Sequence, residues 1–582
     1  MSQDENVLQK ALLSGNEAVA RGAYEAGVIA ASAYPGTPSS EICPALAVYP
    51  GVKVEWSVNE KVALEVGFGT SLCGARTLVT MKHVGVNVAS DPLLTLSYTG
   101  VNGGLVLVSA DDPAMHSSQN EQDNRIYARL AKVPMLEPSD SNEAREFTRK
   151  AFEISEKFDA PVILRMTTRV CHAKTMVDLC DPEPQKTEFS FEKNPQKYVM
   201  IPAYARKRHV VVEQRLKLLK DFAETTDMNF AEYNDAGLGI ICSGIVYQYV
   251  KEVFPQASVF KIGFSYPLCE KKIRDFVSKV KQCYVMEELE PLLYKELRSI
   301  GLDVKGKPDK FIVDELTPAR VKEIITGEST EVAPTSPGKP PVMCAGCIHR
   351  GAFHVLKKLK VIVAGDIGCY TLGALPPLSA LDTCLCMGAS IGTMLGMTKV
   401  LPPEKRKQVV AVIGDSTFFH SGITGLIDVV YNRGVGTIMI LDNQTTAMTG
   451  KQDHPGTGYT LSQEPTVSIL PEKICEAVGV KHISVIDPYY FTGIETALRS
   501  AIEREELTVL VLRRTCVLKA RDPKRRVARV LYEKCVKCQQ CLTIGCPAIT
   551  KSMPPSIDIN LCNGCGLCVQ VCKTGAIQCA DQ

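Results

Sequence analysis

A chain of 582 residues is too long for one hydrophobic core, so about three to five domains are expected. A hydrophobic content of 45% and a charged content of 22% are typical of a soluble globular protein, and a net charge of +2 gives no case for binding nucleic acid. The sequence contains no run of eighteen apolar residues, the length that would predict a membrane span. Met1–Lys10 lacks the apolar core of a signal peptide, so we expect a cytoplasmic protein.

Residues 1–182 alternate apolar strands with helices, which predicts a parallel sheet covered by helices on both faces. The first strand leads into Tyr34–Pro38 (YPGTP), a Gly/Pro turn where a ligand can approach the backbone of Gly36. After the second strand, Glu60 opens a helix, where a carboxylate at least interacts favourably with the helix dipole. The expected strands are Val28–Ser32, Val52–Ser57, Thr77–Met81, Gly104–Ser109 and Pro161–Met166.

Residues 183–329 show a weaker α/β pattern, with strands at Leu238–Cys242 and Cys283–Met286 and a helix at Ile245–Phe254. No catalytic constellation occurs in this segment, so we expect it to be architectural. Thr330–Pro341 (TEVAPTSPGKPP) is rich in proline and is predicted to be a linker.

Residues 342–520 contain the most informative stretch of the chain. Two apolar runs, Val409–Ile413 and Thr437–Leu441, predict buried parallel strands, and Ser421–Tyr431 predicts a helix between them. The carboxyl ends of neighbouring parallel strands are where an open α/β sheet binds its ligand. We therefore expect a binding site at the ends of these two strands.

The residues at those two ends are suited to a diphosphate. Gly414-Asp415-Ser416 follows the first strand and Asp442-Asn443 follows the second. A helix N-terminus attracts a diphosphate, and an Asp beside an Asn supplies the hard oxygen ligands that Mg²⁺ prefers. The alternative is an ordinary βαβ unit with one turn Asp and one turn Asn.

This arrangement resembles the cofactor motif of thiamine diphosphate enzymes, in which Gly-Asp-Gly precedes Asn-Asn. The chain departs from that motif at Ser416 and Asp442. The resemblance implies that Mg²⁺ is held by Asp415, Asn443 and the backbone carbonyl of Thr445. The further cofactor-binding residues that it implies are Gly36, Gly368, Gly414, Ser416 and Asp442.

A second resemblance covers YPGTPSSEI, EWSVNEKVALEVGFG and SADDPAMHSSQNEQDNR and extends over essentially the whole chain. These segments resemble the 2-oxoacid:ferredoxin oxidoreductases. The resemblance implies a pyrimidine-binding domain at 1–182, a transketolase C-terminal-like domain at 183–329 and a diphosphate-binding domain at 342–520. It also implies that Glu60 contacts the aminopyrimidine of the cofactor and that Thr37 and His83 lie in the active site, although a single histidine at a strand end is often structural.

Eight cysteines lie between Cys535 and Cys572 at metal-ligand spacing, which favours clusters over disulfides in a chain without an export signal. Bacterial two-cluster ferredoxins carry such a doubled run, with the fourth cysteine of each run serving the other cluster. Residues 521–582 are therefore predicted to hold two 4Fe–4S clusters, and Cys579 is expected to be free. One ligand set is Cys535, Cys538, Cys541 and Cys572, and the other is Cys562, Cys565, Cys568 and Cys546.

A further cysteine pair, Cys344 and Cys347, has the two-residue gap that lets two thiolates reach one metal centre. The family resemblance implies a third 4Fe–4S cluster whose remaining ligands are Cys369 and Cys516. The alternative is that these cysteines are small buried residues lining the cofactor site, with Cys344 and Cys347 at most a structural zinc pair.

The resemblance implies the oxidative decarboxylation of an arylpyruvate, indolepyruvate above all, to an aryl-acetyl-CoA and CO₂. Thiamine diphosphate supports the decarboxylation, coenzyme A takes the acyl group, and external ferredoxin takes the electrons through the clusters. A smaller β subunit completes a heterodimer or an α₂β₂ assembly. The basic connector Lys519–Lys534 is a solvated linker or, alternatively, a docking surface for an acidic ferredoxin.

Two alternatives to this function remain open from the sequence. The substrate can be another 2-oxo acid, such as phenylglyoxylate, a branched-chain acid or pyruvate. The chain can also be an iron–sulfur electron-transfer subunit whose thiamine site has decayed, for which Ser416 in place of the usual glycine is the best support.

Overall fold

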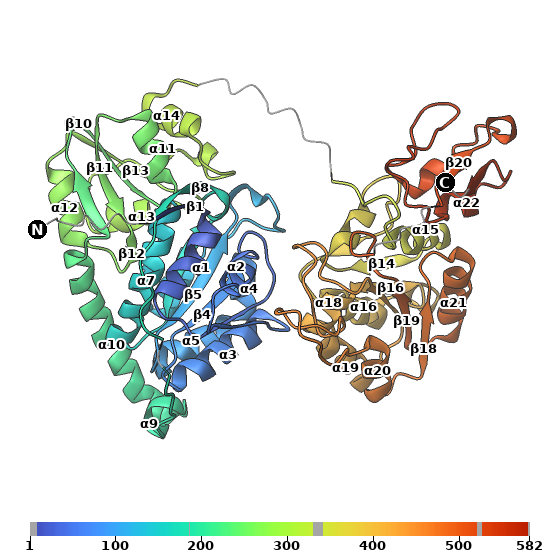
Figure 1. Cartoon of the computed structure of the whole chain (residues 1–582), viewed down its shortest axis with the longest axis horizontal. Coiled ribbons are helices and arrows are strands. Elements are labelled where there is room, and N and C mark those ends of the chain that lie inside the picture. The colour runs from blue at the N-terminus through green and yellow to red at the C-terminus, as the bar shows by residue number, and fades with distance from the viewer. Residues whose placement is uncertain (1–8, 186, 330–340, 521–525, 580–582) are drawn as a thin grey trace, which may run out of the picture. The chain divides into compact units, whose positions relative to one another are not determined.

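The computed structural model describes residues 9–185, 187–329, 341–520 and 526–579. The chain forms two compact units, Met1–Thr335 and Ser336–Gln582, which run from blue to yellow-green and from yellow to red in Figure 1. All but the last residue of the predicted linker Thr330–Pro341 lies outside the described residues. Within the described ranges, no helix is long and apolar enough to cross a membrane.

The first unit is built on a seven-stranded sheet with the strand order β12-β6-β7-β5-β4-β2-β3. Its strands are parallel except for the edge pair of β12 and β6. All residues of β4, β5 and β7 are buried, as expected for strands covered on both faces. The strands are β2 (Ala30–Ala33), β3 (Lys53–Trp56), β4 (Thr77–Lys82), β5 (Leu105–Asp111), β6 (Met135–Leu136), β7 (Val162–Thr167) and β12 (Phe264–Tyr266), so the five predicted strands are all present.

Helices cover this sheet, and α3 and α5 pack on it in a core that includes Leu64, Leu93 and Leu107. Asn59 Oδ1 accepts a hydrogen bond from the Val62 amide at 2.9 Å, so this cap makes Glu60 the first residue of α3. The helices are α1 (Gly15–Glu25), α2 (Ile42–Leu46), α3 (Glu60–Leu72), α4 (His83–Val88), α5 (Ser90–Thr99), α6 (Arg125–Ala131), α7 (Ser141–Phe158) and α8 (Thr168–His172). A two-stranded antiparallel sheet of β1 (Lys10–Ser14) and β8 (Lys174–Asp178) lies beside them.

A four-stranded sheet with the order β13-β10-β11-β9 completes the first unit. The strand–helix–strand pattern predicted in this segment is present as β10, α11 and β13. Because β12 follows β11 in the chain and pairs with β6, this segment also supplies an edge strand to the seven-stranded sheet. The elements are α9 (Pro195–Tyr198), α10 (Pro202–Thr225), β9 (Asn229–Glu232), β10 (Asp235–Ser243), α11 (Val246–Val253), β11 (Ala257–Ile262), α12 (Glu270–Ser278), β13 (Gln282–Met286), α13 (Leu292–Ser299) and α14 (Pro318–Thr326).

A buried network of ion pairs joins the two sheets of the first unit. Arg125 at the start of α6 donates to Glu287, just after β13, at 2.6 Å and to Asp123 at 2.6 Å. Arg165 on β7 pairs with Asp111 at 2.8 Å and with Glu137 at 2.7 Å. Each of these two buried guanidinium groups is therefore neutralised by carboxylates of the same unit.

The second unit contains a six-stranded parallel sheet with the order β15-β14-β16-β17-β19-β18. The two predicted strands are β16 and β17, neighbours at its centre, and both are buried throughout. The strands are β14 (Ile362–Gly365), β15 (Thr383–Cys384), β16 (Val409–Gly414), β17 (Thr437–Asp442), β18 (His482–Ile486) and β19 (Thr508–Arg513). The helices are α15 (His349–Leu359), α16 (Ala389–Val400), α17 (Pro403–Arg406), α19 (Ile423–Tyr431), α20 (Pro471–Ala477) and α21 (Phe491–Arg504).

The predicted start of the helix after β16 is wrong. The chain turns into helix directly at α18 (Asp415–Thr417) and passes through a π-helical turn, Phe418–Gly422, into α19. Ser421 therefore lies inside the helical stretch and does not begin it. The physical consequence is that Asp415 itself stands at the helix N-terminus, where an anion is favoured.

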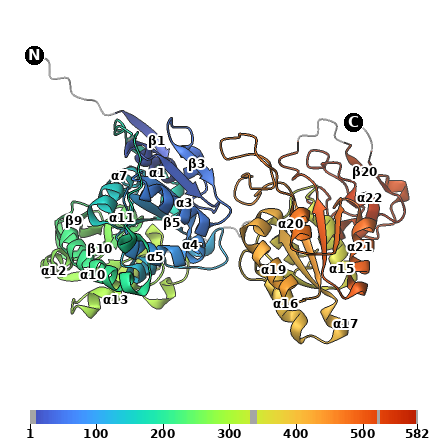
Figure 2. The same ribbon diagram turned by 90° about the horizontal axis from the view of Figure 1, so that it is seen from below.

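The C-terminal module packs on the second unit's sheet through a shared core. Alternate residues of β16 face opposite sides, so that Val410 and Val412 join a core that also contains Ile544, Leu567 and Ile577 of the module. The module's elements are β20 (Ala528–Val530), β21 (Ile577–Cys579) and α22 (Leu567–Val571), and Figure 2 shows β20 and α22 on the side of the sheet that carries α21. One core thus holds the cysteine-rich module and the sheet together.

Candidate functional site

The tips of β16 and β17 bring the predicted magnesium ligands onto neighbouring strands. The buried carboxylate of Asp415 accepts the amide of Ser416 at 2.9 Å through Oδ1 and the amide of Gln444 at 2.7 Å through Oδ2. Asn443 Oδ1 accepts the amide of Thr445 at 3.1 Å. Carboxylate, amide and backbone carbonyl oxygens are the ligands that Mg²⁺ prefers, so the donor atoms of Asp415, Asn443 and Thr445 fit this ion.

His454 contacts Asp415 and was not found by the sequence analysis. Its Nε2 lies 3.1 Å from Asp415 Oδ2, and its Nδ1 accepts the amide of Gly456 at 3.1 Å. Because Nδ1 is an acceptor, the proton of the neutral ring lies on Nε2 and is donated to the carboxylate. Burial raises the pKa of Asp415, but the His454 contact outweighs it and holds that pKa below its ordinary value. Asp415 is therefore ionised, as a metal ligand has to be.

Asp442, which replaces the usual asparagine, is engaged by an arginine. Arg513 Nε donates to Asp442 Oδ2 at 2.6 Å, and the same guanidinium pairs with Glu472 at 2.5 Å. Burial and the neighbouring charge of Asp415 raise the pKa of Asp442 to about 6, with Arg513 acting in the opposite direction. Asp442 Oδ1 also accepts the amide of Gln444 at 3.2 Å. The two oxygens of Asp442 therefore bind Arg513 and the Gln444 backbone, and they stabilise the end of β17.

The other residues predicted at this tip pack closely. A Cβ on Gly414 or on Gly368 would lie 2.7 or 2.4 Å from the ring of Tyr370, so both glycines leave room for that ring. The Tyr370 hydroxyl donates to the carbonyl of Ile367 at 2.9 Å. The hydroxyl of Ser416 accepts from that of Thr446 at 2.8 Å, which links the tips of β16 and β17 once more.

In the first unit, the predicted turn at Gly36 and Thr37 packs against Lys82, a residue that the sequence analysis missed. A Cβ on Gly36 would lie 2.8 Å from Lys82 Cβ. Lys82 Nζ donates to the carbonyl of Ser117 at 2.7 Å, and the Ser117 hydroxyl donates to the carbonyl of Thr37 at 3.3 Å. Burial lowers the pKa of Lys82 to about 8, and the charge of Asp112 opposes that shift. A buried ammonium group therefore lies beside the turn.

His83 and Glu60 lie on the same side of the first unit's sheet, near α4. His83 is fully buried at the start of α4; its Nε2 is 3.2 Å from Asn120 Oδ1, and its Nδ1 has no hydrogen-bond partner among the described residues. A Cβ on Gly85 would lie 2.7 Å from Glu60 Oε1, so the missing side chain makes room for that carboxylate. α4 thus begins with His83 and carries, two residues later, Gly85, which lies against Glu60.

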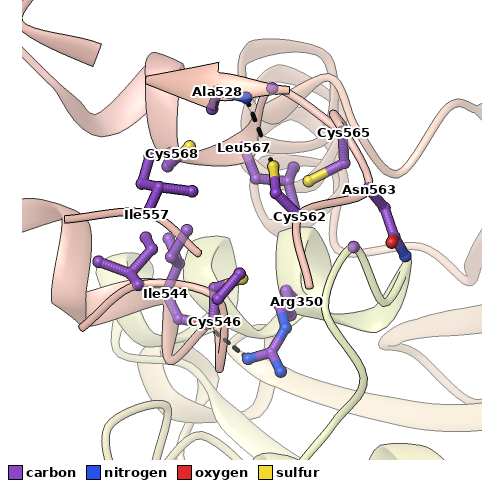
Figure 3. A pocket seen from close by; sticks show the side chains of 14 residues that line it. Arg350, Ala528, Ile544, Cys546, Ile557, Cys562, Asn563, Cys565, Leu567 and Cys568 are labelled. Atoms are coloured by element: carbon purple, nitrogen blue, oxygen red, sulfur yellow. Dashed lines mark hydrogen bonds between the residues drawn. The ribbon is translucent and has the colours of Figure 1, made fainter. Parts of the chain in front are cut away.

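One predicted cluster set surrounds an apolar pocket, which we call the inner pocket (Figure 3). Its cysteines are Cys546, Cys562, Cys565 and Cys568, the set in which the fourth cysteine comes from the other run. Gly346 and Arg350 of the diphosphate-binding segment also line it. Asn563 Nδ2 donates to the carbonyl of Ala345 at 2.6 Å, so the Cys344–Cys347 loop contacts the wall of this pocket.

The other set surrounds a second apolar pocket, the outer pocket. It is lined by Cys535, Cys538, Cys541 and Cys572 together with Val530, Gln540 and Ile577, all from the C-terminal module. Burial acts to raise the pKa of Cys572, but hydrogen bonds from Thr574 and from backbone amides outweigh it and lower that pKa. None of these cysteines forms a disulfide, and no three His, Cys, Asp or Glu side chains in the described ranges converge on one metal-ion position.

The third cysteine set gathers at the β17 tip. The amide of Cys516 donates to the carbonyl of Asn443 at 2.9 Å. The amide of Cys347 donates to the carbonyl of Cys344 at 3.0 Å. Burial raises the pKa of Cys347 to about 12, and the neighbouring thiols of Cys369 and Cys344 add to this increase. Burial also raises the pKa of Cys369 to about 11, and the thiols of Cys516 and Cys344 add to it. The four thiols therefore lie close enough to influence one another.

Comparisons with known proteins bear on each of these regions. Residues 21–235 match the family described as pyruvate flavodoxin/ferredoxin oxidoreductase, thiamine diphosphate-binding; residues 366–512 match the C-terminal thiamine pyrophosphate-binding domain of thiamine enzymes; and residues 555–578 match a 4Fe-4S binding domain. An indolepyruvate oxidoreductase subunit IorA from Archaeoglobus fulgidus is 40% identical over 98% of this chain and 97% of its own length. The chain belongs to the 2-oxoacid:ferredoxin oxidoreductase family.

Other known proteins are also similar to this chain. IorA subunits from Methanothermobacter marburgensis and Pyrococcus horikoshii are 41% and 38% identical over 97% and 98% of this chain and 97% of their own lengths. A solved 2-oxoglutarate:ferredoxin oxidoreductase from Magnetococcus marinus is 16% identical over 56% of this chain and 66% of that chain, with a TM-score of 0.47.

These matches confirm the family and the multidomain α/β fold predicted from the sequence. The chain is part of a 2-oxoacid:ferredoxin oxidoreductase that uses thiamine diphosphate and iron–sulfur clusters. Its strand tips and its cysteine pockets are accordingly the candidate sites for these two kinds of cofactor.

Proposed function

We propose that this chain catalyses the oxidative decarboxylation of an arylpyruvate, indolepyruvate foremost, to an aryl-acetyl-CoA and CO₂, with external ferredoxin as electron acceptor. The substrate proposal is supported by the names of the relatives that match the chain over nearly its whole length. The observation that carries the reaction type is that one hydrophobic core joins the strand tips at Asp415 to the cysteine pockets.

Thiamine diphosphate, when bound, supplies the carbon centre that attacks the keto group and allows CO₂ to leave. Asp415, Asn443 and the carbonyl of Thr445 would hold Mg²⁺ beside the diphosphate, and the hydrogen bond from His454 Nε2 orients Asp415 for this role. Glu60 is the carboxylate that contacts the aminopyrimidine. Its burial, at 5% exposed, strengthens any hydrogen bond to a cofactor nitrogen.

We assign binding of the 2-oxo acid to the region around Thr37, Lys82 and His83. The ammonium group of Lys82 is the cation that meets the substrate carboxylate, because only one of its close contacts is shorter than 3 Å and further N–H groups remain for a ligand. His83 Nδ1, which has no hydrogen-bond partner among the described residues, is a second polar atom available on the next residue of the chain. The backbone of Gly36 allows the cofactor to approach.

The electrons leave through clusters held by the two ligand sets named above, and the pockets support that assignment because each is lined by one complete set. The inner pocket includes Gly346 and Arg350, whereas the outer pocket is lined by the C-terminal module alone. We therefore propose that Cys546, Cys562, Cys565 and Cys568 would hold a cluster closer to the thiamine site, and that Cys535, Cys538, Cys541 and Cys572 would hold the one from which ferredoxin takes electrons. The set Cys344, Cys347, Cys369 and Cys516 holds a third cluster nearest the strand tips.

The assembly is proposed to include a smaller β subunit, because the relatives are named as subunits of an oxidoreductase. Either a heterodimer or an α₂β₂ assembly satisfies this proposal, and coenzyme A is its second substrate. A cytoplasmic location agrees with the reduced cysteines and with electron transfer to ferredoxin.

An anaerobic assay tests this function directly. The chain and its partner subunit are supplied with thiamine diphosphate, Mg²⁺ and coenzyme A, and the reduction of a viologen is followed with indolepyruvate and with pyruvate. Fast reduction with indolepyruvate alone is expected. Reduction with pyruvate alone would retain the reaction type and overturn the substrate. No reduction with any 2-oxo acid, while dithionite still bleaches the clusters, would identify an electron carrier instead.

A further inference from the structure

Arg350 is one of the largest fully buried side chains of the described residues, and it lies between two cysteine loops. Its Nη1 donates to the carbonyls of Ile544 and Gly545 at 2.9 and 2.6 Å, on the loop that leads to Cys546. Its Nε and Nη2 donate to the carbonyl of Cys344 at 3.2 Å, and Nη2 also donates to that of Met343. One guanidinium group therefore fastens the Cys344–Cys347 loop to the inner pocket (Figure 3).

The charge of this guanidinium is not neutralised by a carboxylate. Among the described residues, no Asp or Glu lies within ion-pair distance of Arg350, and carbonyl oxygens are its hydrogen-bond partners. A buried cation without a counter-charge costs several kcal/mol in a protein interior. Burial lowers the pKa of Arg350, and the thiols of Cys347, Cys546, Cys565 and Cys344 act in the opposite direction.

The first unit shows what this chain does with a buried arginine elsewhere. Arg125 and Arg165 are buried to the same degree, yet each contacts carboxylates at 2.8 Å or less. Arg215 of the first unit is also buried and donates to the carbonyls of Asp159 and Ser97, with no carboxylate paired to it among the described residues. Arg350 differs from Arg215 because it lines the pocket of Cys546, Cys562, Cys565 and Cys568, so a group bound by these cysteines would supply a counter-charge. A 4Fe–4S cluster with four thiolate ligands is an anion, and its negative charge grows by one on reduction.

We propose that Arg350 is a positioning residue that stabilises the reduced, more anionic state of the inner cluster and holds the Cys344–Cys347 loop against it. This inference rests on the proposed ligands of the inner cluster and is independent of the thiamine reaction. Net charge and hydrogen bonding near the sulfurs are known determinants of cluster potentials. Because the group is buried, its charge acts through a low effective dielectric constant and is little screened by salt.

The test compares two substitutions of Arg350 in the full chain with its partner subunit. Arg350→Gln removes the charge, and Arg350→Lys keeps the charge but loses the planar fork. Arg529→Gln removes the same charge from an exposed position on β20 and is the matched control. Each protein is titrated anaerobically against a graded reductant potential, with EPR following each cluster and iron analysis reporting cluster content. The signal lost in Cys565→Ser identifies the inner cluster.

Arg350→Gln is expected to lower the reduction equilibrium of the inner cluster about tenfold, a shift of about 59 mV to more negative potential for a one-electron couple. Arg350→Lys and Arg529→Gln are expected to stay within about threefold of the parent protein. Equal shifts in both Arg350 variants, or equal loss of iron from both, would overturn the charge role and leave only a structural clamp. An unshifted Arg350→Gln protein with full iron content would overturn the proposal altogether.

These outcomes are separate from those of the proposed function. A parent protein whose clusters titrate normally but which oxidises no 2-oxo acid would refute the proposed reaction and leave the role of Arg350 standing. A shift confined to the inner cluster supports the proposal whether or not the third cluster forms.

Discussion

The ion-pair network around Arg125 and Arg165 in the first unit and the candidate sites of the second unit pair their buried charges differently. In the first unit, Arg125 and Arg165 are matched by four carboxylates of the same unit, so that the charges neutralise one another. In the second unit, Asp415 accepts hydrogen bonds from His454 and from two backbone amides, and Arg350 donates to carbonyl oxygens. The incomplete pairing in the second unit is what a site needs if a metal ion and anionic clusters are to supply the missing charges.

This difference separates structural from functional groups by a physical criterion. An ion-pair network in which each buried charge has an opposite charge beside it stabilises the contact between two sheets and needs no bound ion for neutrality. A buried carboxylate that accepts two amides and a histidine still has lone pairs left for a cation. Substitutions in the first network should therefore change stability, whereas substitutions at the strand tips of the second unit should change cofactor binding and turnover.

Asp415→Ala is expected to have the largest effect on turnover. Loss of the proposed Mg²⁺ ligand should lower the rate of viologen reduction by about 10³-fold or more, because a metal clamp contributes several kcal/mol. The measurement is turnover together with thiamine diphosphate affinity as Mg²⁺ is varied. Asp428→Ala, at an exposed position of α19, is the control. Normal cofactor affinity in Asp415→Ala would contradict the assigned role.

Arg125→Met should destabilise the first unit by about 3–5 kcal/mol, because it leaves Asp123 and Glu287 buried without their partner. Urea unfolding followed by tyrosine fluorescence and circular dichroism measures this loss. Arg298→Met, which removes an arginine from a more exposed ion pair, serves as the control. If Arg125→Met were to cost less than about 1 kcal/mol, the network would not be the closed structural unit described above.

The strand tips could be predicted from the sequence because their signals are local. The apolar runs of β16 and β17 and the polar residues directly after them fixed Asp415 and Asn443 correctly at neighbouring tips. The helix start was misplaced because Ser421 has the character of an N-cap, whereas the chain enters the helix at Asp415 through a π-helical turn.

Residues whose roles depend on tertiary contacts were beyond the sequence analysis. His454 meets Asp415 across 39 residues of chain, with no periodicity or spacing to indicate the pair. Lys82 carries its meaning only through its burial beside Gly36 and Ser117. The edge strand β12 is three residues long and pairs across the chain with β6, so no local pattern predicts it.

Lys82→Met tests whether a buried charge of the first unit binds the substrate. We expect kcat/KM for the 2-oxo acid to fall about 100-fold, mostly through KM, because a charge-assisted contact to the substrate carboxylate contributes about 1.5–3 kcal/mol. Lys174→Met, at an exposed position on β8, should leave kcat/KM unchanged. An unchanged KM in Lys82→Met would place this lysine with the structural charges of the unit.

The smallest effect is expected at Glu288, the least neutralised carboxylate near the network. Burial raises its pKa to about 7, with Arg165 lowering it and Glu315 raising it. Because the folded state keeps this proton and the unfolded state loses it near pH 4.5, the free energy of unfolding should fall as pH rises from about 4.5 to 7. Glu288→Gln mimics the protonated form, so it should be about 2 kcal/mol more stable than the parent at pH 6 and nearly equal to it at about pH 4. Thermal or urea unfolding at both pH values measures the difference, and the exposed Glu290→Gln should show none. If the difference between Glu288→Gln and the parent did not depend on pH, the pKa of Glu288 would not be raised in the folded state. Glu288 would then be an ionised carboxylate neutralised by its neighbours, like those paired with Arg125 and Arg165.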